Sequence, residues 1–247
     1  MLVFSTQKNL GVLASCKNYF MDGTFKTVPV IFEQLYTIHG MKNGYVIPLV
    51  YALLPNKNEQ TYRKFLRTVK TISPTLDVQS VNTDFEPAII KAVKEEFPSS
   101  NHYGCFFHFC QCVYRKVCEF GLKKRYDTDA EFSLNIRMLL ALAFVPADRV
   151  VETFNTLMDE NIYSVEALPI VDYYEDTWIG RPGRRNTRHP PKFDIEMWSC
   201  FERVQEDLPK TNNIIEGWHH AFLHPFLWLS STYLEILSST KKRTSPD

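Results

Sequence analysis

Three acidic side chains stand where the elements of this sequence can bring them together around metal ions. Asp22 and Asp84 each lie at the end of an expected strand, and Glu216 lies in the first turn of an expected late helix. Neighbouring strands are about 4.8 Å apart, so carboxylates at the same end of two strands can share a divalent cation. Three such carboxylates can hold two Mg²⁺ or Mn²⁺ ions, the arrangement that cleaves phosphodiesters. The pattern predicts two-metal phosphodiester chemistry.

Each acid also has an ordinary structural interpretation. The Asp22-Gly23 pair is typical of a β-hairpin turn. Asp84 can be a solvated loop acid, and Glu216 follows Asn213 at the spacing of a helix capping box. Local sequence alone favours the cap for Glu216, whereas the pairing of Asp84 with Asp22 after a separate strand favours a metal role for these two acids.

Cys105 and His108 have the two-residue gap of zinc ligands, with Cys110 and Cys112 close by. A structural zinc needs four ligands, and the sequence offers no second pair at zinc spacing. The alternative is a buried Cys105 and a polar His108 at the end of a strand.

Basic residues gather in a loop rich in proline and glycine that follows Trp178. Arg181, Arg184, Arg185 and Arg188 lie within eight residues there. Such a run is usually a solvated loop, but arginines also contact DNA phosphates and a tryptophan can stack on a base. Because 28 basic and 28 acidic residues cancel, DNA binding has to depend on local patches such as this one.

The elements that position these residues follow an α/β pattern. We expect three antiparallel strands, the first ending near Asp22 and the others within residues 27–40 and 44–55. A helix over residues 58–72 follows, then a short strand over 78–82 and a helix that begins at Pro87. Residues 101–122 read as a strand that runs into a helix, and residues 123–205 as mainly helical.

The composition is that of a globular protein. Its 247 residues are 45% hydrophobic, enough for a large core. Six cysteines without a secretory leader favour a reducing compartment. The longest apolar run, Met138 to Val145, is far shorter than the roughly 20 residues of a membrane span, so we expect a soluble protein with no membrane partner.

Four motifs in order resemble the Mutator-like element (MULE) transposases. They are "MDGTF" around Asp22, "TDFEPAI" around Asp84, "CFFH" from Cys105 to His108 and "TNNIIEGWHHAF" around Glu216. The approach to the last motif, residues 178–204, is also similar to the family. A single Asp-Gly or Thr-Asp carries little information, whereas the ordered set spans most of the chain.

The resemblance implies a ribonuclease H-like fold with a catalytic DDE triad. Asp22, Asp84 and Glu216 would bind two Mg²⁺ or Mn²⁺ ions, and Cys105 and His108 would form a family motif beside the site. It also implies three parts: a catalytic core over 1–122, a helical insertion over 123–205, and a catalytic helix within 206–247 that completes the core.

The implied function is that of a DNA transposase, which hydrolyses a phosphodiester and joins the freed 3′-hydroxyl to target DNA. Its partners would be transposon ends, target DNA and further copies of the chain, in the nucleus. One alternative is a truncated, domesticated or inactive copy that binds DNA or protein. Another is a cellular nuclease of the same fold.

Overall fold

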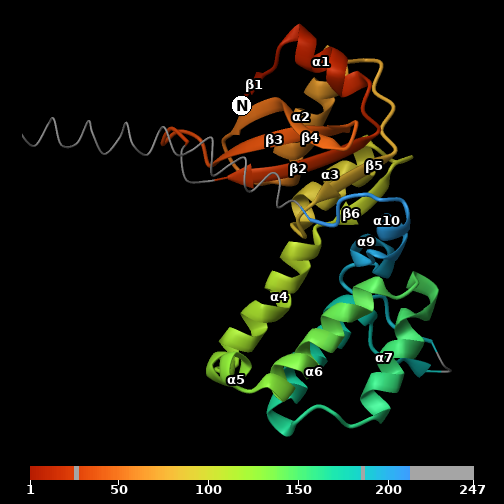
Figure 1. Ribbon diagram of the computed structural model, residues 1–247. Coiled ribbons are helices and arrows are strands. Elements are labelled where there is room, and N and C mark those ends of the chain that lie inside the picture. Colours follow the sequence, from red (N-terminus) through yellow and green to blue (C-terminus); the bar gives the residue numbers. More distant parts are fainter. Residues whose placement is uncertain (25–27, 185–186, 212–247) are drawn as a thin grey trace, which may run out of the picture.

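A computed structural model describes residues 1–24, 28–184 and 187–211, and it contains a mixed sheet joined to a helical region (Figure 1). The sheet has six strands in the order β1-β4-β3-β2-β5-β6. These strands are β1 (Leu2–Phe4), β2 (Asn18–Thr24), β3 (Gln34–Lys42), β4 (Tyr45–Leu54), β5 (Ser80–Thr83) and β6 (Asn101–Gly104). Three pairs are antiparallel: β1 with β4, β4 with β3, and β3 with β2. The other two pairs, β2 with β5 and β5 with β6, are parallel. The expectation of a mixed α/β sheet flanked by helices is confirmed.

The Asp22-Gly23 pair is not a turn. Both residues lie inside β2, opposite Thr37 and Tyr36 of β3. The hairpin between β3 and β4 turns instead at Asn43 and Gly44, whose φ angles are 51° and 79°. Positive φ at both central residues is the signature of the type I′ turn, which suits Asn-Gly.

The strand expected over 27–40 is shorter in the structure, because β3 begins only at Gln34. Before it, the backbone N–H of Phe32 donates to the carbonyl of Pro29 at 2.8 Å, which makes a turn. Proline has no N–H for a sheet ladder, and Val30 and Ile31 are exposed.

Helix α2 (Glu59–Ile72) forms where the sequence predicts it. Its N-cap residue Asn58 accepts a hydrogen bond from the backbone N–H of Thr61 at 2.8 Å, which satisfies an otherwise orphan donor. The apolar positions Tyr62, Phe65, Leu66 and Val69 are fully buried. They pack with α1 (Gln7–Ala14), α3 (Pro87–Glu96) and the sheet into one hydrophobic core.

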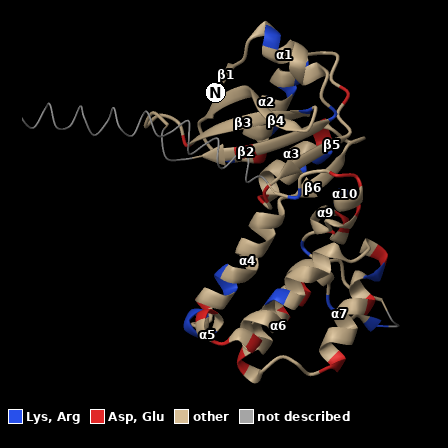
Figure 2. Cartoon of the chain, in the orientation of Figure 1, with Lys and Arg blue, Asp and Glu red and all other residues tan. Residues whose placement is uncertain are grey.

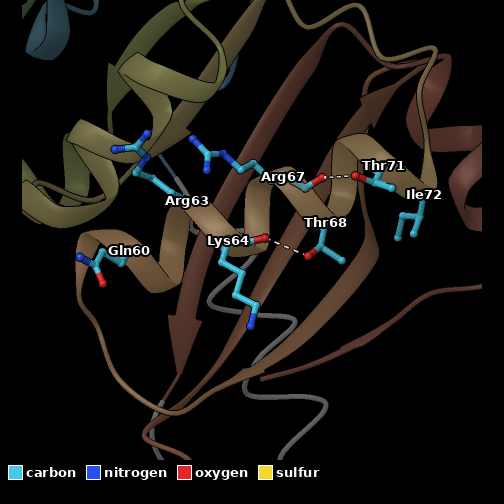
Figure 3. A pocket seen from close by; sticks show the side chains of 7 residues that line it. All are labelled: Gln60, Arg63, Lys64, Arg67, Thr68, Thr71 and Ile72. Atoms are coloured by element: carbon cyan, nitrogen blue, oxygen red, sulfur yellow. Dashed lines mark hydrogen bonds between the residues drawn. The ribbon is translucent and has the colours of Figure 1, made fainter.

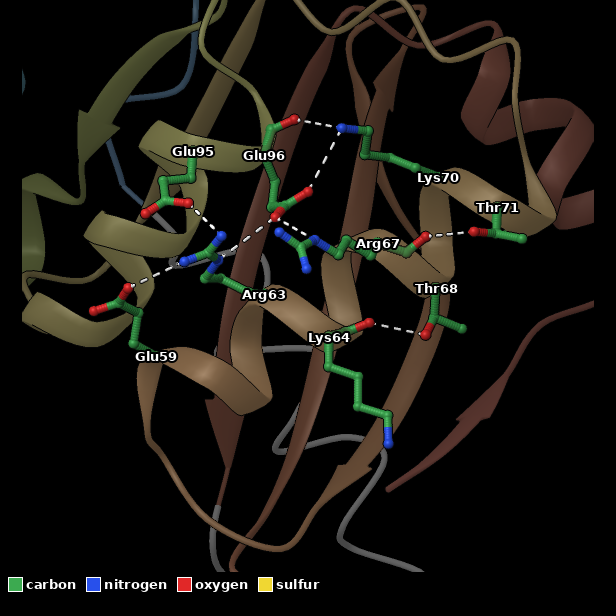
Figure 4. Close-up of polar contacts among 9 residues, drawn as sticks. All are labelled: Glu59, Arg63, Lys64, Arg67, Thr68, Lys70, Thr71, Glu95 and Glu96. Atoms are coloured by element: carbon green, nitrogen blue, oxygen red, sulfur yellow. Dashed lines mark hydrogen bonds and ion pairs between the residues drawn. The ribbon is translucent and has the colours of Figure 1, made fainter.

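Ion pairs join α2 to α3 (Figure 4). Glu96 is buried, and its carboxylate lies 2.7 Å from Arg67, 3.6 Å from Lys70 and 3.7 Å from Arg63. Arg63 also pairs with Glu95. The groove along α2 in Figure 3 is lined by these same arginines. The charges of Arg63 and Arg67 are paired with acids of α3.

The rest of the described chain is mainly helical, as expected for residues 123–205. Its helices are α4 (Phe106–Glu119), α5 (Lys123–Thr128), α6 (Ala130–Ala141), α7 (Val150–Asp159), α8 (Leu168–Tyr174), α9 (Ile195–Trp198) and α10 (Phe201–Gln205). Helix α4 leads away from the sheet and shares a second core with the following helices (Figure 1). In that core the rings of Phe109 and Trp198 stack with centroids 5.1 Å apart. The three-part division at residues 122 and 205 stays a prediction.

The chain returns to the sheet through α10, beside β6. The Arg203 side chain is 1% exposed, and its guanidinium donates to the carbonyls of Gly104 and Ser199 at 3.1 Å. The backbone N–H of Phe106 donates to the carbonyl of Lys210 at 2.9 Å. These bonds bring the last described residues next to the start of α4.

Candidate active site

Asp22 and Asp84 line the same cleft, whose volume is about 360 Å³. Phe20 of β2 pairs with Asn82 of β5 in a parallel ladder, and each aspartate comes two residues after its member of that pair. Parallel strands end at the same edge of a sheet, so this register brings the two carboxylates to one place. Asp22 is 9% exposed. The predicted convergence of these two acids is therefore present in the structure.

Gly23 allows side chains to approach the Asp22 backbone closely. A Cβ at Gly23 would lie 2.5 Å from Oε1 of Gln34, closer than real Cβ contacts, and 3.0 Å from the Tyr36 ring, which is tighter than most of them. Asp22 Oδ1 accepts the Gly23 N–H at 2.9 Å, which orients the carboxylate. The absence of a side chain at Gly23 therefore allows Gln34 and Tyr36 to pack closely in the cleft.

Asp84 is held at the turn between β5 and α3, where its Oδ1 accepts the backbone N–H of Glu86 at 3.2 Å. Burial raises the pKa of the Asp84 carboxyl, and the charge of Asp22 adds to the rise. The hydrogen bond from Glu86 and the charge of His108 oppose it. Two partly desolvated carboxylates that repel each other provide hard oxygen ligands, which suit a divalent cation.

One wall of the cleft contains a chain of hydrogen bonds that joins the side chains of Gln34, Tyr62 and Glu86. Gln34 Nε2 donates to the hydroxyl of Tyr62 at 2.9 Å, and Tyr62 donates to Glu86 Oε2 at 3.1 Å. Burial raises the pKa of Glu86, as does the charge of Asp84. The buried hydroxyl of Tyr36, also in this wall, has no hydrogen-bond partner among residues 1–24, 28–184 and 187–211. It is available to a bound group.

Helix α4 forms the other wall with His108, Gln111, Cys112 and Arg115. Burial alone would lower the pKa of His108, but the interaction with the Cys105 sulfur and the charges of Asp22 and Asp84 raise it to about 9. His108 is therefore a cation at neutral pH. Cys105 is buried at the start of α4.

The part of the chain that the structure describes contains no group of three or more His, Cys, Asp or Glu side chains placed to hold a metal ion. The zinc interpretation of Cys105 and His108 thus gains no support. Glu216, the predicted third ligand of the catalytic ions, lies outside the described residues.

The arginine loop differs from expectation most clearly at Trp178. This side chain is fully buried and packs against Phe85, Phe109 and Phe193. Its buried ring counts against the predicted stacking contact with a base, which stays a prediction. Sequence spacing cannot show that the residue before an exposed loop is the centre of an aromatic core.

Two of the loop arginines have acidic partners within the protein. Arg181 pairs with Asp176 and Asp172, and Arg188 lies 2.9 Å from Glu175. Arg184 is exposed, and Arg185 lies outside the described residues. DNA contact by this loop stays a prediction, and the internal pairing weakens it for Arg181 and Arg188.

Several cleft residues were not identified from the sequence. They are Gln34, Tyr36, Lys57, Tyr62, Glu86, Gln111, Cys112 and Arg115. The helical spacing of the α4 residues from His108 onward was a usable signal. Gln34 and Tyr36 reach the cleft through strand pairing, whereas Lys57, Tyr62 and Glu86 reach it through the packing of α2 and α3 on the sheet.

Residues 19–112 match the family model of the MULE transposase domain. The matched segment contains both cleft aspartates and the Cys105–His108 motif, and it confirms the resemblance drawn from the motifs. This segment is similar to a MULE transposase domain, which suggests a nucleic-acid-processing enzyme that interacts with DNA. A comparison with curated proteins gives no match. Among the residues with described positions, no helix is long and apolar enough to cross a bilayer.

Proposed function

We propose that this chain is the catalytic domain of a Mutator-like DNA transposase. It hydrolyses a phosphodiester at a transposon end and transfers the freed 3′-hydroxyl to target DNA. The observation that carries the proposal is the meeting of Asp22 and Asp84 in one cleft, where Asp22 lies near the end of β2 and Asp84 directly follows the parallel strand β5.

The topology supports a ribonuclease H-like fold. Three antiparallel strands, β2 to β4, follow β1 and α1, and α2 separates them from the strand–helix units β5–α3 and β6–α4. The sequence pattern predicts the same order of strands and helices. Residues 123–205 are the proposed helical insertion.

The cleft fits divalent cations. Asp22 and Asp84 supply carboxylate oxygens, and burial raises the pKa of Asp84, so a bound cation would favour its ionised form. When bound, two Mg²⁺ or Mn²⁺ ions would activate the attacking oxygen and stabilise the leaving one.

Glu216 is the proposed third ligand. Lys210 lies against Phe106 at the start of α4, and six residues of chain span at most roughly 20 Å. The length of this chain segment therefore limits Glu216 to roughly 20 Å from the start of α4, the helix that carries His108 of the cleft.

The chain's own residues keep the cleft in shape. Tyr62 holds Glu86, and the Glu86 N–H in turn holds Asp84. The cationic His108 lies near both aspartates and limits their repulsion. Transposon ends and target DNA are the proposed partners, with several copies of the chain acting together in the nucleus.

A strand-transfer assay tests the function. The intact chain is incubated with transposon-end DNA and a target plasmid in Mg²⁺ or Mn²⁺, beside Asp22→Asn, Asp84→Asn and Glu216→Gln. We expect joined products from the intact chain alone, with each variant reduced at least about 100-fold, since a metal ligand acts on the transition state. Exposed Asp148→Asn is the matched control. Equal activity in all variants would remove the triad.

A further inference from the structure

Two basic side chains stand on separate walls of the cleft that holds Asp22 and Asp84. Lys57 belongs to the segment between β4 and α2, and Arg115 belongs to the third turn of α4. We propose that Lys57 and Arg115 bind the sugar–phosphate backbone of a DNA strand on either side of the phosphodiester presented to the aspartates. The identity of the ligand rests on the proposed function.

The face of α4 that lines the cleft is a continuous polar track. His108, Gln111, Cys112 and Arg115 follow one another at intervals of three, four and seven residues from His108, which places them on one side of a helix. Seven residues advance roughly 10 Å along a helix, about the rise of three nucleotides in one strand. The track thus leads from the carboxylates to Arg115 over a few nucleotides. Basic residues of α4 lie toward its α5 end (Figure 2).

The guanidinium of Arg115 is positioned to bind a phosphate. One of its terminal nitrogens donates to Oε1 of Gln111 at 2.6 Å, which holds the side chain along the track. Within the described ranges, no carboxylate lies at ion-pair distance from it. Arg63, Arg181 and Arg188, by contrast, each pair with an acid. A guanidinium with free N–H groups binds two oxygens of one phosphate in its planar fork.

Lys57 lines the same cleft as Asp84 and Glu86. Burial raises the pKa of Glu86 and of Asp84, and the positive charge of Lys57 opposes both rises. Lys57 is therefore close enough to act on the field inside the cleft.

The acids make such basic groups necessary. Asp22, Asp84 and Glu86 carry like charge with a phosphodiester and repel it. Phosphate contacts, which carry no sequence information, fix the register of the strand. Cations on both walls would hold the backbone across the acidic centre, so that one phosphodiester faces the aspartates.

A binding experiment in EDTA tests this inference without requiring catalysis. Anisotropy of a fluorescent DNA duplex is measured with the intact chain at salt concentrations from about 50 to 200 mM, the range in which phosphate contacts weaken strongly. Each of Lys57→Gln and Arg115→Gln should weaken binding about tenfold and lower the slope of log K against log salt by about 0.9. Arg115→Lys keeps the charge and should keep the slope.

Matched controls are Lys8→Gln on α1 and Arg149→Gln before α7, both at exposed positions. Both should keep the wild-type slope of log K against log salt to within half of the roughly 0.9 expected for one phosphate contact. Lys57 and Arg115 are not core residues, so the thermal midpoints of their variants should equal that of the wild type.

The outcomes separate the two proposals. Wild-type slopes for both Lys57→Gln and Arg115→Gln, in a protein that binds and joins DNA, would overturn the backbone contact and leave the transposase function in place. Failure of the wild type to bind DNA at any salt concentration would overturn both. A reduced slope with lost affinity in the two variants alone supports the contact.

Discussion

Trp178 packs edge-on against Phe85, with ring centroids 4.9 Å apart and planes at 87°. Phe85 is the neighbour of Asp84 in sequence, so a residue of the helical region supports the turn that carries a candidate metal ligand. The sheet region and the helical region therefore pack against each other beside the cleft.

Trp178→Ala should lower the free energy of unfolding by about 3–5 kcal/mol, because it removes the largest ring from a packed core. Urea denaturation measures this loss, and Trp178→Phe should lose less. The base-stacking interpretation predicts the reverse pattern: unchanged stability with weaker DNA binding.

Gly23→Ala should reduce strand transfer and destabilise the fold by about 1–3 kcal/mol, since the new Cβ would clash with Gln34 and Tyr36. Gly11→Ala is the matched control. Gly11 lies in helix α1, and a Cβ added there would have no atom within 4 Å, so alanine should be neutral or stabilise by up to about 1 kcal/mol. Chemical denaturation and the joining assay report the difference, and equal effects at both glycines would contradict the role given to Gly23.

Arg203→Met should destabilise the protein by about 2–4 kcal/mol, because it leaves the carbonyls of Gly104 and Ser199 without their buried donor. Arg149→Met, at an exposed position, should change stability by less than about 0.5 kcal/mol. Thermal unfolding of the two variants checks the contrast. A neutral Arg203→Met would show that the return of the chain to β6 does not depend on this side chain.

The pH dependence of stability should reveal His108. Its pKa of about 9 in the folded protein lies above the value of about 6.5 in an unfolded chain. The resulting stabilisation is fully present below pH 6.5 and is lost as pH rises through 9. In metal-free buffer, the wild type should lose about 2–3 kcal/mol more than His108→Gln between about pH 6.5 and 9.5. An equal loss of unfolding free energy in both proteins over this pH range would contradict the interactions assigned to His108.

Local signals in the sequence were enough for some elements. Asn58 and the four apolar positions after it define α2, and Pro87 defines the start of α3. Asp84 was placed correctly because a strand and a helix start bracket it within a few residues.

Non-local pairing decided the rest. Asp22-Gly23 has the chemistry of a turn, but β3 and β5 pair on the two sides of β2 and keep it extended. Trp178 is buried by rings from residues 85 to 198, which no local window contains. The short elements β1 and α1 were not expected at all, since β1 has only three residues and α1 only a weak apolar face.

Anomalous diffraction from crystals soaked in Mn²⁺ tests most directly whether the two aspartates form a metal site. We expect a Mn²⁺ peak in the cleft, within about 2.0–2.3 Å of carboxylate oxygens from both Asp22 and Asp84, and no such peak in Asp84→Asn. Peaks only at other sites, or a cleft peak that survives the loss of both aspartates, would contradict the proposed metal site.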